Sequence, residues 1–282
     1  MDASRQSAGC SRPGEVARAL PASSGDPLGP GRGVVRYWAR VEYDGTDFYG
    51  FQVQARERTV QGELERALER VTGQATRVTG AGRTDRGVHA SGQMVSFEVP
   101  WRREQAELYR ALNAVLADDV AIRDMGRAPE GFHPRFSASS RTYQYTLLNQ
   151  KGRSPLAQRT AWWVERKLEL GPMVQASRSV VGTHDFATFG RSPTGENTVR
   201  TVCRAEWQQQ GPFLTFEIEA NAFLYRMVRS LVGMLVLVGW KEISPDRFDE
   251  IRKALDRSRV KLVAPAQGLC LVQVDYPEGV LS

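Results

Sequence analysis

A glycine-rich stretch, GAGRTDRGVHASGQ (80–93), contains the residues best suited to chemistry. It places one carboxylate, Asp85, between two guanidinium groups, Arg83 and Arg86. Neighbouring guanidinium groups favour the ionised form of a carboxylate, which can then act as a nucleophile or an electrostatic stabiliser. The glycines let a substrate approach the backbone closely. The same arrangement also occurs as a structural ion pair that braces a surface turn, and residue chemistry alone leaves both interpretations open.

The stretch matches neither of the common nucleotide-binding loops. A dinucleotide-binding fingerprint needs a third glycine where Asp85 stands, and a carboxylate there would repel the pyrophosphate. A P-loop needs Gly-Lys-Ser/Thr after four spacer residues, and this sequence is absent from the stretch. The three histidines and three cysteines are scattered along the chain, so we expect no metal site.

The basic residues are almost all arginine. Only five of the 38 lysine and arginine residues are lysine, and the formal net charge is +6. Arginine binds phosphate bidentately and stacks on bases, which favours a nucleic-acid partner, although a GC-rich genome produces the same bias. The longest apolar run, SLVGMLVLVGW (230–240), is too short to span a bilayer. We expect a buried helix there, no membrane association, and a reducing, cytoplasmic compartment.

Two series of strands and helices must position the glycine-rich stretch. Apolar residues alternate in the expected strands and recur at helical spacing in the expected helices. The first series is strand 37–43, helix 59–73, strand 93–99 and helix 104–116. The second is strand 141–148, a helix with Met173, Ala176 and Val180, strand 213–219, helix 227–239, a helix with Phe248, Ile251 and Leu255, and strand 269–276.

This order predicts an α+β protein with two halves, in which helices pack on one face of a sheet. We place the boundary in HPRFSASS, which gives domains at 34–136 and 137–282. Residues 1–33 are rich in Gly, Pro, Ser and Ala without sustained periodicity, and they are predicted to form a disordered extension.

GRTDRGVHASGQ resembles the active-site motif of the tRNA pseudouridine synthase A family, whose pattern is GRTDxGVHAxGQ. The resemblance runs from about residue 36 to residue 277. Its further blocks, in family order, are YDGTDFYGFQVQ with TVQGELERAL, HPRFSASSRTYQY, THDFATF, NAFLYRMVRSLVGML and APAQGLCLVQVDY. It implies two ferredoxin-like (RRM-like) α/β halves, joined through a mixed, mainly antiparallel sheet with an active-site cleft between them.

The resemblance implies an isomerase that converts uridine to pseudouridine in the anticodon stem-loop of tRNA, at positions 38–40. The reaction breaks the C1′–N1 bond, rotates the base and rejoins it through C5, without a metal or small-molecule cofactor. The implied protein is a homodimer with tRNA as its partner. Two alternatives are a non-catalytic RNA-binding protein on the same scaffold and an RRM-type module. The strand that characterises an RRM is not found.

By this match Asp85 corresponds to the catalytic aspartate. It would attack C6 of uracil or C1′ of ribose, or assist departure of the base, and the sequence does not choose among these. Tyr143 matches the active-site tyrosine, whose ring suits stacking on uracil and whose hydroxyl suits a relay of the C5 proton. Arg229 matches the basic residue that pairs with the catalytic carboxylate, and an arginine in an apolar helix needs such a partner.

The remaining predicted substrate contacts are Arg83, Arg86 and Leu269. Leu269 matches an apolar residue that packs near the target base, and Arg83 is expected to contact RNA or Asp85. Arg86 departs from the family pattern, which usually has a small residue directly after the aspartate. His89 is expected to be structural, because the implied mechanism needs no imidazole.

Overall fold

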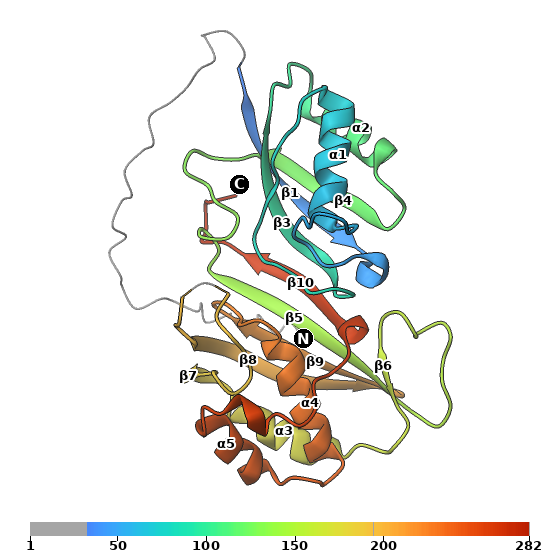
Figure 1. Ribbon diagram of the computed structural model, residues 1–282, viewed down its shortest axis with the longest axis vertical. Coiled ribbons are helices and arrows are strands. Elements are labelled where there is room, and N and C mark those ends of the chain that lie inside the picture. The colour runs from blue at the N-terminus through green and yellow to red at the C-terminus, as the bar shows by residue number, and fades with distance from the viewer. Residues whose placement is uncertain (1–32, 194, 282) are drawn as a thin grey trace, which may run out of the picture.

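The computed structural model describes residues 33–193 and 195–281, and shows two groups of helices packed on one continuous sheet (Figure 1). The predicted disordered extension, apart from Gly33, lies outside the described residues. The elements are β1 (Val35–Tyr43), η1 (Gly45–Asp47), α1 (Val60–Thr72), β2 (Thr79–Gly80), β3 (His89–Val99), α2 (Gln105–Val115), β4 (Val120–Arg127), β5 (Ser140–Asn149), β6 (Trp162–Val164), α3 (Leu170–Arg178), β7 (Gly182–Asp185), β8 (Val199–Gln210), β9 (Phe213–Ala220), α4 (Met227–Gly239), α5 (Pro245–Lys253), η2 (Arg257–Arg259), η3 (Ala266–Gly268) and β10 (Leu269–Asp275).

The main path of the sheet runs β4-β1-β3-β10-β5-β9-β8-β7. Its pairs are antiparallel except for β10 with β3, and the side pair of β5 with β6 is also parallel. The predicted α+β class with a mixed, mainly antiparallel sheet is therefore confirmed. The last strand, β10, lies between β3 and β5 (Figure 1), so the end of the chain joins the earlier elements to the later ones.

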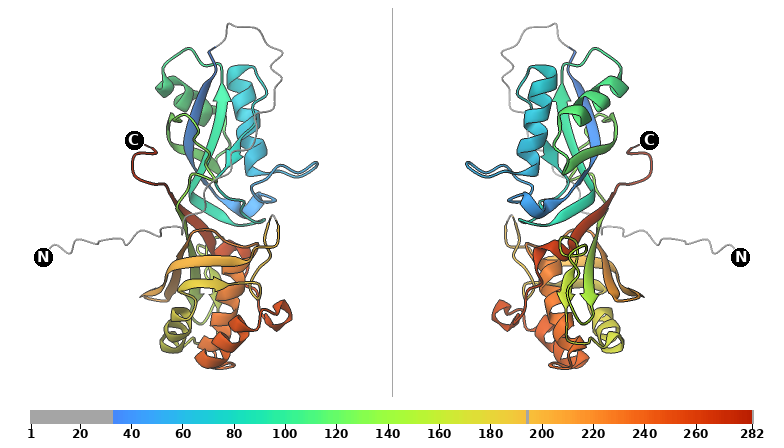
Figure 2. Two further views of the ribbon diagram at one scale, coloured as in Figure 1. Left: turned by 90° about the vertical axis from the view of Figure 1, so that its left-hand side faces the viewer. Right: turned by 90° about the vertical axis from the view of Figure 1, so that its right-hand side faces the viewer.

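The elements up to β4 occupy one end of the molecule, and α3, α4 and α5 occupy the other (Figure 2). In the first group, Thr59 caps α1 through its side chain, and Gly73 ends the helix with a φ of 72°. Leu64 and Leu68 of α1 lie beside Leu112 of α2 around one small void in the core. The exact division of the chain at residues 136 and 137 stays a prediction.

The second group is built around α4, which is buried along almost its whole length. A Cβ at Gly233 would lie 2.1 Å from the carbonyl oxygen of Leu262, so the chain that leads into β10 runs directly along this helix. The placement of Leu255 in the last predicted helix is wrong. Helix α5 ends at Lys253, and Leu255 follows with a φ of 54° and 51% of its surface exposed. Within the described ranges no helix is both long and apolar enough to cross a bilayer.

Candidate active site

A cleft of about 1200 Å³ is lined by residues from both groups of elements. The six residues singled out from the sequence all line it: Arg83, Asp85, Arg86, Tyr143, Arg229 and Leu269. Among the described residues, Asp85 is the one carboxylate in this lining, whereas arginines are numerous. They are Arg77, Arg83, Arg86, Arg135, Arg141, Arg191, Arg200, Arg226 and Arg229. Such a cleft favours a polyanion and exceeds the usual volume of a small-molecule pocket.

Asp85 lies in the loop between β2 and β3, and hydrogen bonds fix this loop on both sides. The hydroxyl groups of Thr84 and Tyr43 are 2.8 Å apart, and Gln93 donates to the carbonyl oxygen of Gly82 at 2.9 Å. The backbone N–H of Val88 donates to the carbonyl oxygen of Asp85 at 3.1 Å, which closes a turn. Gly87 lies within that turn with a φ of 76°, a conformation that favours glycine.

The segment after β1 packs against the same loop. The backbone N–H of Phe51 donates to the carbonyl oxygen of Thr84 at 3.1 Å, and that of Gly87 donates to Phe48 at 3.2 Å. A Cβ at Gly50 would lie 2.7 Å from the carbonyl oxygen of Thr84, so a larger residue would displace the loop. The segment after β1, which contains Phe48, Gly50 and Phe51, therefore acts as the rigid support of Asp85.

The guanidinium partner of Asp85 comes from α4. Nη1 of Arg229 lies 3.2 Å from Oδ2 of Asp85, and both side chains are largely buried, at 15% and 19% exposure. Nε of Arg229 donates to the carbonyl oxygen of Ala264 at 2.8 Å, which orients the guanidinium group. Within the described residues Oδ1 of Asp85 accepts no hydrogen bond. Asp85 lines the cleft, and its carboxylate thus has one oxygen held by Arg229 and one that no described residue engages.

Tyr143 projects from β5 into the cleft and is 9% exposed. Its ring meets Phe223 edge-on, with the ring centroids 5.0 Å apart. Burial raises the pKa of the Tyr143 hydroxyl far above its usual value, and the negative charge of Asp85 raises it further. Tyr143 is therefore a neutral phenol at ordinary pH, able to stack and to donate a hydrogen bond. A Cβ at Gly82 would lie 4.0 Å from this hydroxyl, so the loop that carries Asp85 passes close to Tyr143.

The two arginines beside Asp85 in sequence are both exposed. The guanidinium carbon of Arg86 lies 4.0 Å from the centroid of the Tyr49 ring, so this side chain stacks on an aromatic face. Arg83 forms no ion pair with a described residue. Leu269 is buried at the start of β10, directly opposite Tyr145. The guanidinium group that contacts the carboxylate is thus neither sequence neighbour but a residue 144 positions away.

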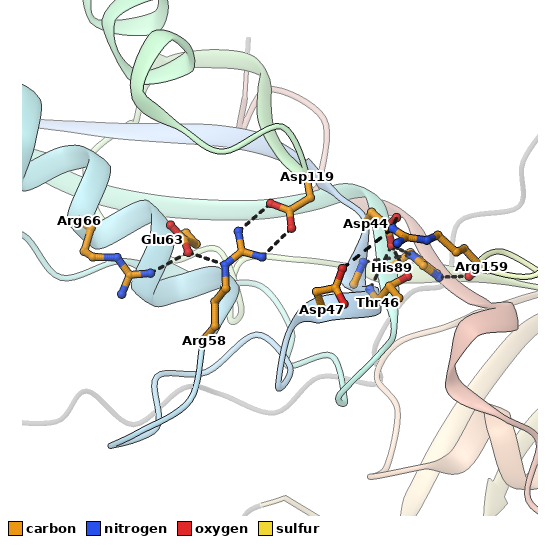
Figure 3. Close-up of polar contacts among 10 residues, drawn as sticks. Asp44, Thr46, Asp47, Arg58, Glu63, Arg66, His89, Asp119 and Arg159 are labelled. Carbon is orange, nitrogen blue, oxygen red and sulfur yellow. Dashed lines mark hydrogen bonds and ion pairs between the residues drawn. The ribbon is translucent and has the colours of Figure 1, made fainter.

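His89 lies at the junction of β3 and β10 and not in the lining of the cleft. Its Nδ1 accepts from the backbone N–H of Gly45 at 3.0 Å, and its Nε2 lies within 2.8 Å of the Arg159 carbonyl oxygen. Nδ1 is also 3.2 Å from Asp44. Figure 3 shows this junction network, in which Arg159 reaches both Asp44 and Asp47. These contacts fit a structural histidine.

Several of the polar and aromatic residues that line the cleft were not predicted from the sequence. Most of the arginines in this lining come from separate loops and strands, and only the fold brings them together. Three aromatic side chains in the lining are exposed, namely Tyr49, Phe136 and Tyr225. Each has the guanidinium group of an arginine near its ring. The HPRF and LYR runs contained two of these pairs as neighbours, Arg135 with Phe136 and Arg226 with Tyr225, a signal that only becomes meaningful once both reach one cleft.

An α+β scaffold with an arginine-rich cleft is typical of the class of proteins that bind nucleic acid. The tRNA pseudouridine synthase family model matches residues 39–137 and 176–277. The chain belongs to this family. The matched ranges include Asp85 and Arg229, whereas Tyr143 lies between them.

Curated relatives agree along most of the chain. A tRNA pseudouridine synthase A from Roseiflexus castenholzii is 43% identical over 245 residues, which is 85% of this chain and 90% of the relative. A tRNA pseudouridine synthase A from Pseudothermotoga lettingae is 42% identical over 243 residues, which is 86% of this chain and 99% of the relative. Among solved structures, the archaeal box H/ACA sRNP Nop10–Cbf5 complex aligns at a TM-score of 0.32 with 12% identity, covering 72% of this chain and 43% of that chain. A likeness this low adds nothing to the fold assignment.

Proposed function

We propose that the protein isomerises uridine to pseudouridine in the anticodon stem-loop of tRNA, at positions 38–40, with Asp85 as the catalytic residue. The observation that supports this most is the open oxygen of Asp85 in a cleft otherwise lined by basic and neutral groups. A purely RNA-binding cleft gains nothing from a carboxylate that repels phosphate. Family membership and relatives named for this reaction support the same assignment.

In this proposal the target uridine leaves its stack and enters the cleft, as bases do in other enzymes that act on them. Asp85 then acts on the sugar or the base with its free oxygen, while Arg229 holds the other oxygen in place. Tyr143, as a neutral phenol, stacks on the uracil and supports the transfer of the proton that C5 loses when C5 bonds to C1′. Leu269 supplies apolar contact, and Arg83 contacts phosphate. Arg86 approaches the RNA from its stacked position on Tyr49.

We further propose that the enzyme is a cytoplasmic homodimer that uses no metal or small-molecule cofactor. The arginine-rich lining supports recognition of tRNA by shape and phosphate contacts rather than by a linear sequence code.

The test uses tRNA transcripts with tritium at C5 of uridine. Tritium enters water only when C5 forms its new bond, so release reports completed isomerisation. We expect release from transcripts with uridine at positions 38–40 and none when all three are cytidine. Release that persists with cytidine at all three positions would contradict the assigned site. Tight tRNA binding without any release would point to an RNA-binding relative that has lost catalysis.

A further inference from the structure

Phe136 is a large apolar side chain that lies in the cleft with 66% of its surface exposed. Single exposed apolar residues are common on protein surfaces and need no explanation by themselves. Phe136 differs from most of them because its backbone is fixed. The surrounding segment, residues 133–137, has no regular secondary structure, yet hydrogen bonds hold almost every one of its residues.

His133 organises the segment. Its Nδ1 accepts from the backbone N–H groups of Arg135 at 3.1 Å and Phe136 at 3.3 Å. Its backbone N–H donates to the hydroxyl of Ser137 at 3.0 Å, and its carbonyl oxygen accepts from the Ser137 N–H at 2.9 Å. These four bonds close a compact turn with Phe136 at its exposed tip. The backbone that carries the ring is therefore fixed, and the ring does not lie on a loose loop.

The fold also anchors this turn from outside. The hydroxyl of Tyr276 donates to the carbonyl oxygen of Pro134 at 2.8 Å, and the buried guanidinium group of Arg141 donates to the carbonyl oxygen of Arg135. Holding an apolar ring in water on a fixed segment is unfavourable unless a partner covers the ring. Fixing the segment costs conformational entropy, and without a partner no apolar surface of the ring is buried in return. The arrangement indicates a preorganised contact surface.

The groups around the ring indicate what covers it. The imidazole ring of His133 backs Phe136 at 4.3 Å between centroids, and the guanidinium carbon of Arg135 lies 5.5 Å from the Phe136 centroid. Arg135 and Arg200 both line the cleft, and burial together with the charge of Arg135 lowers the pKa of Arg200. Nε of Arg200 is buried without a hydrogen-bond partner among the described residues. An aromatic face beside one guanidinium group, with a second guanidinium group in the same cleft, suits a base together with its phosphate.

We propose that Phe136 is a stacking platform for an unpaired nucleobase of the RNA substrate, and that Arg135 and Arg200 hold the phosphate next to that base. The proposal rests on the proposed function in that it takes RNA to be the occupant of the cleft. Stacking on an aromatic ring tolerates any base, so this site would help one cleft accept tRNAs that differ in sequence. It is distinct from Tyr143, which lies beside Asp85 and is buried.

The test measures tRNA affinity in an Asp85→Asn background, so that no turnover occurs. We expect Phe136→Ala to weaken affinity about 5- to 150-fold, the loss that follows removal of one base–aromatic stack. Phe136→Tyr keeps a ring and should bind within about twofold of the starting value. Phe213→Ala is the matched control, because Phe213 is an exposed phenylalanine, at 37%, outside the lining of the cleft.

Salt dependence separates stacking from charge. Phe136→Ala should leave the slope of log Kd against log salt unchanged, whereas Arg135→Ala should reduce the slope by about 0.7–0.9 if it removes one phosphate contact. 2-Aminopurine placed at successive loop positions of the tRNA gives an independent reading. Its fluorescence should be quenched at one position by the parent and by Phe136→Tyr, and should recover with Phe136→Ala.

Three outcomes would overturn the proposal. The first is unchanged affinity and unchanged 2-aminopurine quenching in Phe136→Ala. The second is a smaller mass by light scattering for Phe136→Ala, which would place the ring in a contact between two copies of the chain. The third is a loss of affinity equalled by Phe213→Ala. If the proposed function is wrong, the parent protein releases no tritium. The binding and quenching measurements still decide the role of Phe136 in that case.

Discussion

Two aspartates in this molecule lie close to arginine and near glycine, but their surroundings differ. Asp44, at the junction of the two groups of elements, accepts hydrogen bonds from the backbone and the side chain of Thr46. It also contacts Arg159 at 3.3 Å and His89 at 3.2 Å (Figure 3). Asp85, in the cleft, is held among the described residues by Arg229 alone, and none of them donates to its other oxygen.

The difference shows how the surroundings of a carboxylate set its use. Burial works to raise the pKa of Asp44, but the hydrogen bonds from Thr46, with His89 and Arg159 close by, outweigh it and hold the pKa below its usual value. The carboxylate oxygens of Asp44 are thus engaged in contacts that hold segments of the chain together. Asp85 lies on a rigid loop and has one oxygen that no described residue engages, so this oxygen remains available to a ligand.

The first prediction tests the different roles of the two aspartates by neutralising each in turn. Asp85→Asn should reduce tritium release by about four orders of magnitude or more, because an amide cannot replace an ionised carboxylate in the reaction. Affinity for tRNA should stay within a few-fold of that of the parent. Single-turnover tritium release and binding isotherms measure the two effects separately.

Asp44→Asn is the matched control for Asp85→Asn. It should keep turnover within about tenfold of the parent but lower the melting temperature, because it weakens the contacts to Arg159 and His89 while the cleft keeps its groups. If Asp85→Asn stayed active, or if both variants lost activity equally, the assignment of the reactive role to Asp85 would be wrong.

A second prediction concerns the partner of Asp85. Arg229→Met should lower the free energy of unfolding by about 1–3 kcal/mol, less than for a fully buried pair, because both groups retain some exposure. The change leaves Asp85 without its cation and removes the bond to Ala264. Urea denaturation measures the effect.

The double variant Asp85→Asn/Arg229→Met distinguishes an ion pair from simple packing. It should recover part of the lost stability, because it no longer buries an unpaired carboxylate. Strictly additive losses would show that the two side chains do not stabilise each other.

Local patterns in the sequence predicted the strands and helices whose apolar residues keep a regular period. The strand around Tyr143 and the apolar helix that carries Arg229 appear where alternation and composition placed them. Strand β8 was not predicted, because most of its residues are at least partly exposed and it therefore lacks strict alternation. Strand β4 was missed as well, since a register shift opposite Arg40 and Val41 interrupts its period.

The site was predictable only as far as its residues lie in recognisable motifs. Asp85, Tyr143 and Arg229 were named from motif matches, and the fold then placed them around one cleft. The insertion of β10 between β3 and β5 joins segments that are distant in sequence, and no local pattern indicates it. Arg200 lies in β8 and reaches the cleft of Arg135 and Phe136 through the pairing of β5, β9 and β8, which could not be read from spacing.

The third prediction contrasts one arginine from each region. Arg83 lines the cleft and forms no ion pair with a described residue, whereas Arg159 pairs with Asp44 and Asp47 at the junction. Arg83→Ala should lower the salt slope of tRNA binding by about 0.7–0.9, as expected for one lost phosphate contact. Arg159→Ala should leave that slope unchanged and cost at most about 1 kcal/mol of stability, because its ion pairs are exposed. Equal slopes for both variants would remove the distinction between the two regions.

The smallest expected effect concerns the histidine beneath the Phe136 turn. Burial lowers the pKa of His133, with further contributions from the charges of Arg135 and Arg36. The unfolded chain, with an ordinary pKa of about 6.5, therefore binds this proton at a higher pH than the folded one, and stability is lost as the pH falls below that value.

His133→Asn keeps an acceptor for the N–H groups of Arg135 and Phe136 but cannot titrate. Between pH 7 and pH 5 the parent should lose about 1 °C more in melting temperature than His133→Asn. An identical pH profile in the two proteins would show that protonation of His133 does not strain the turn.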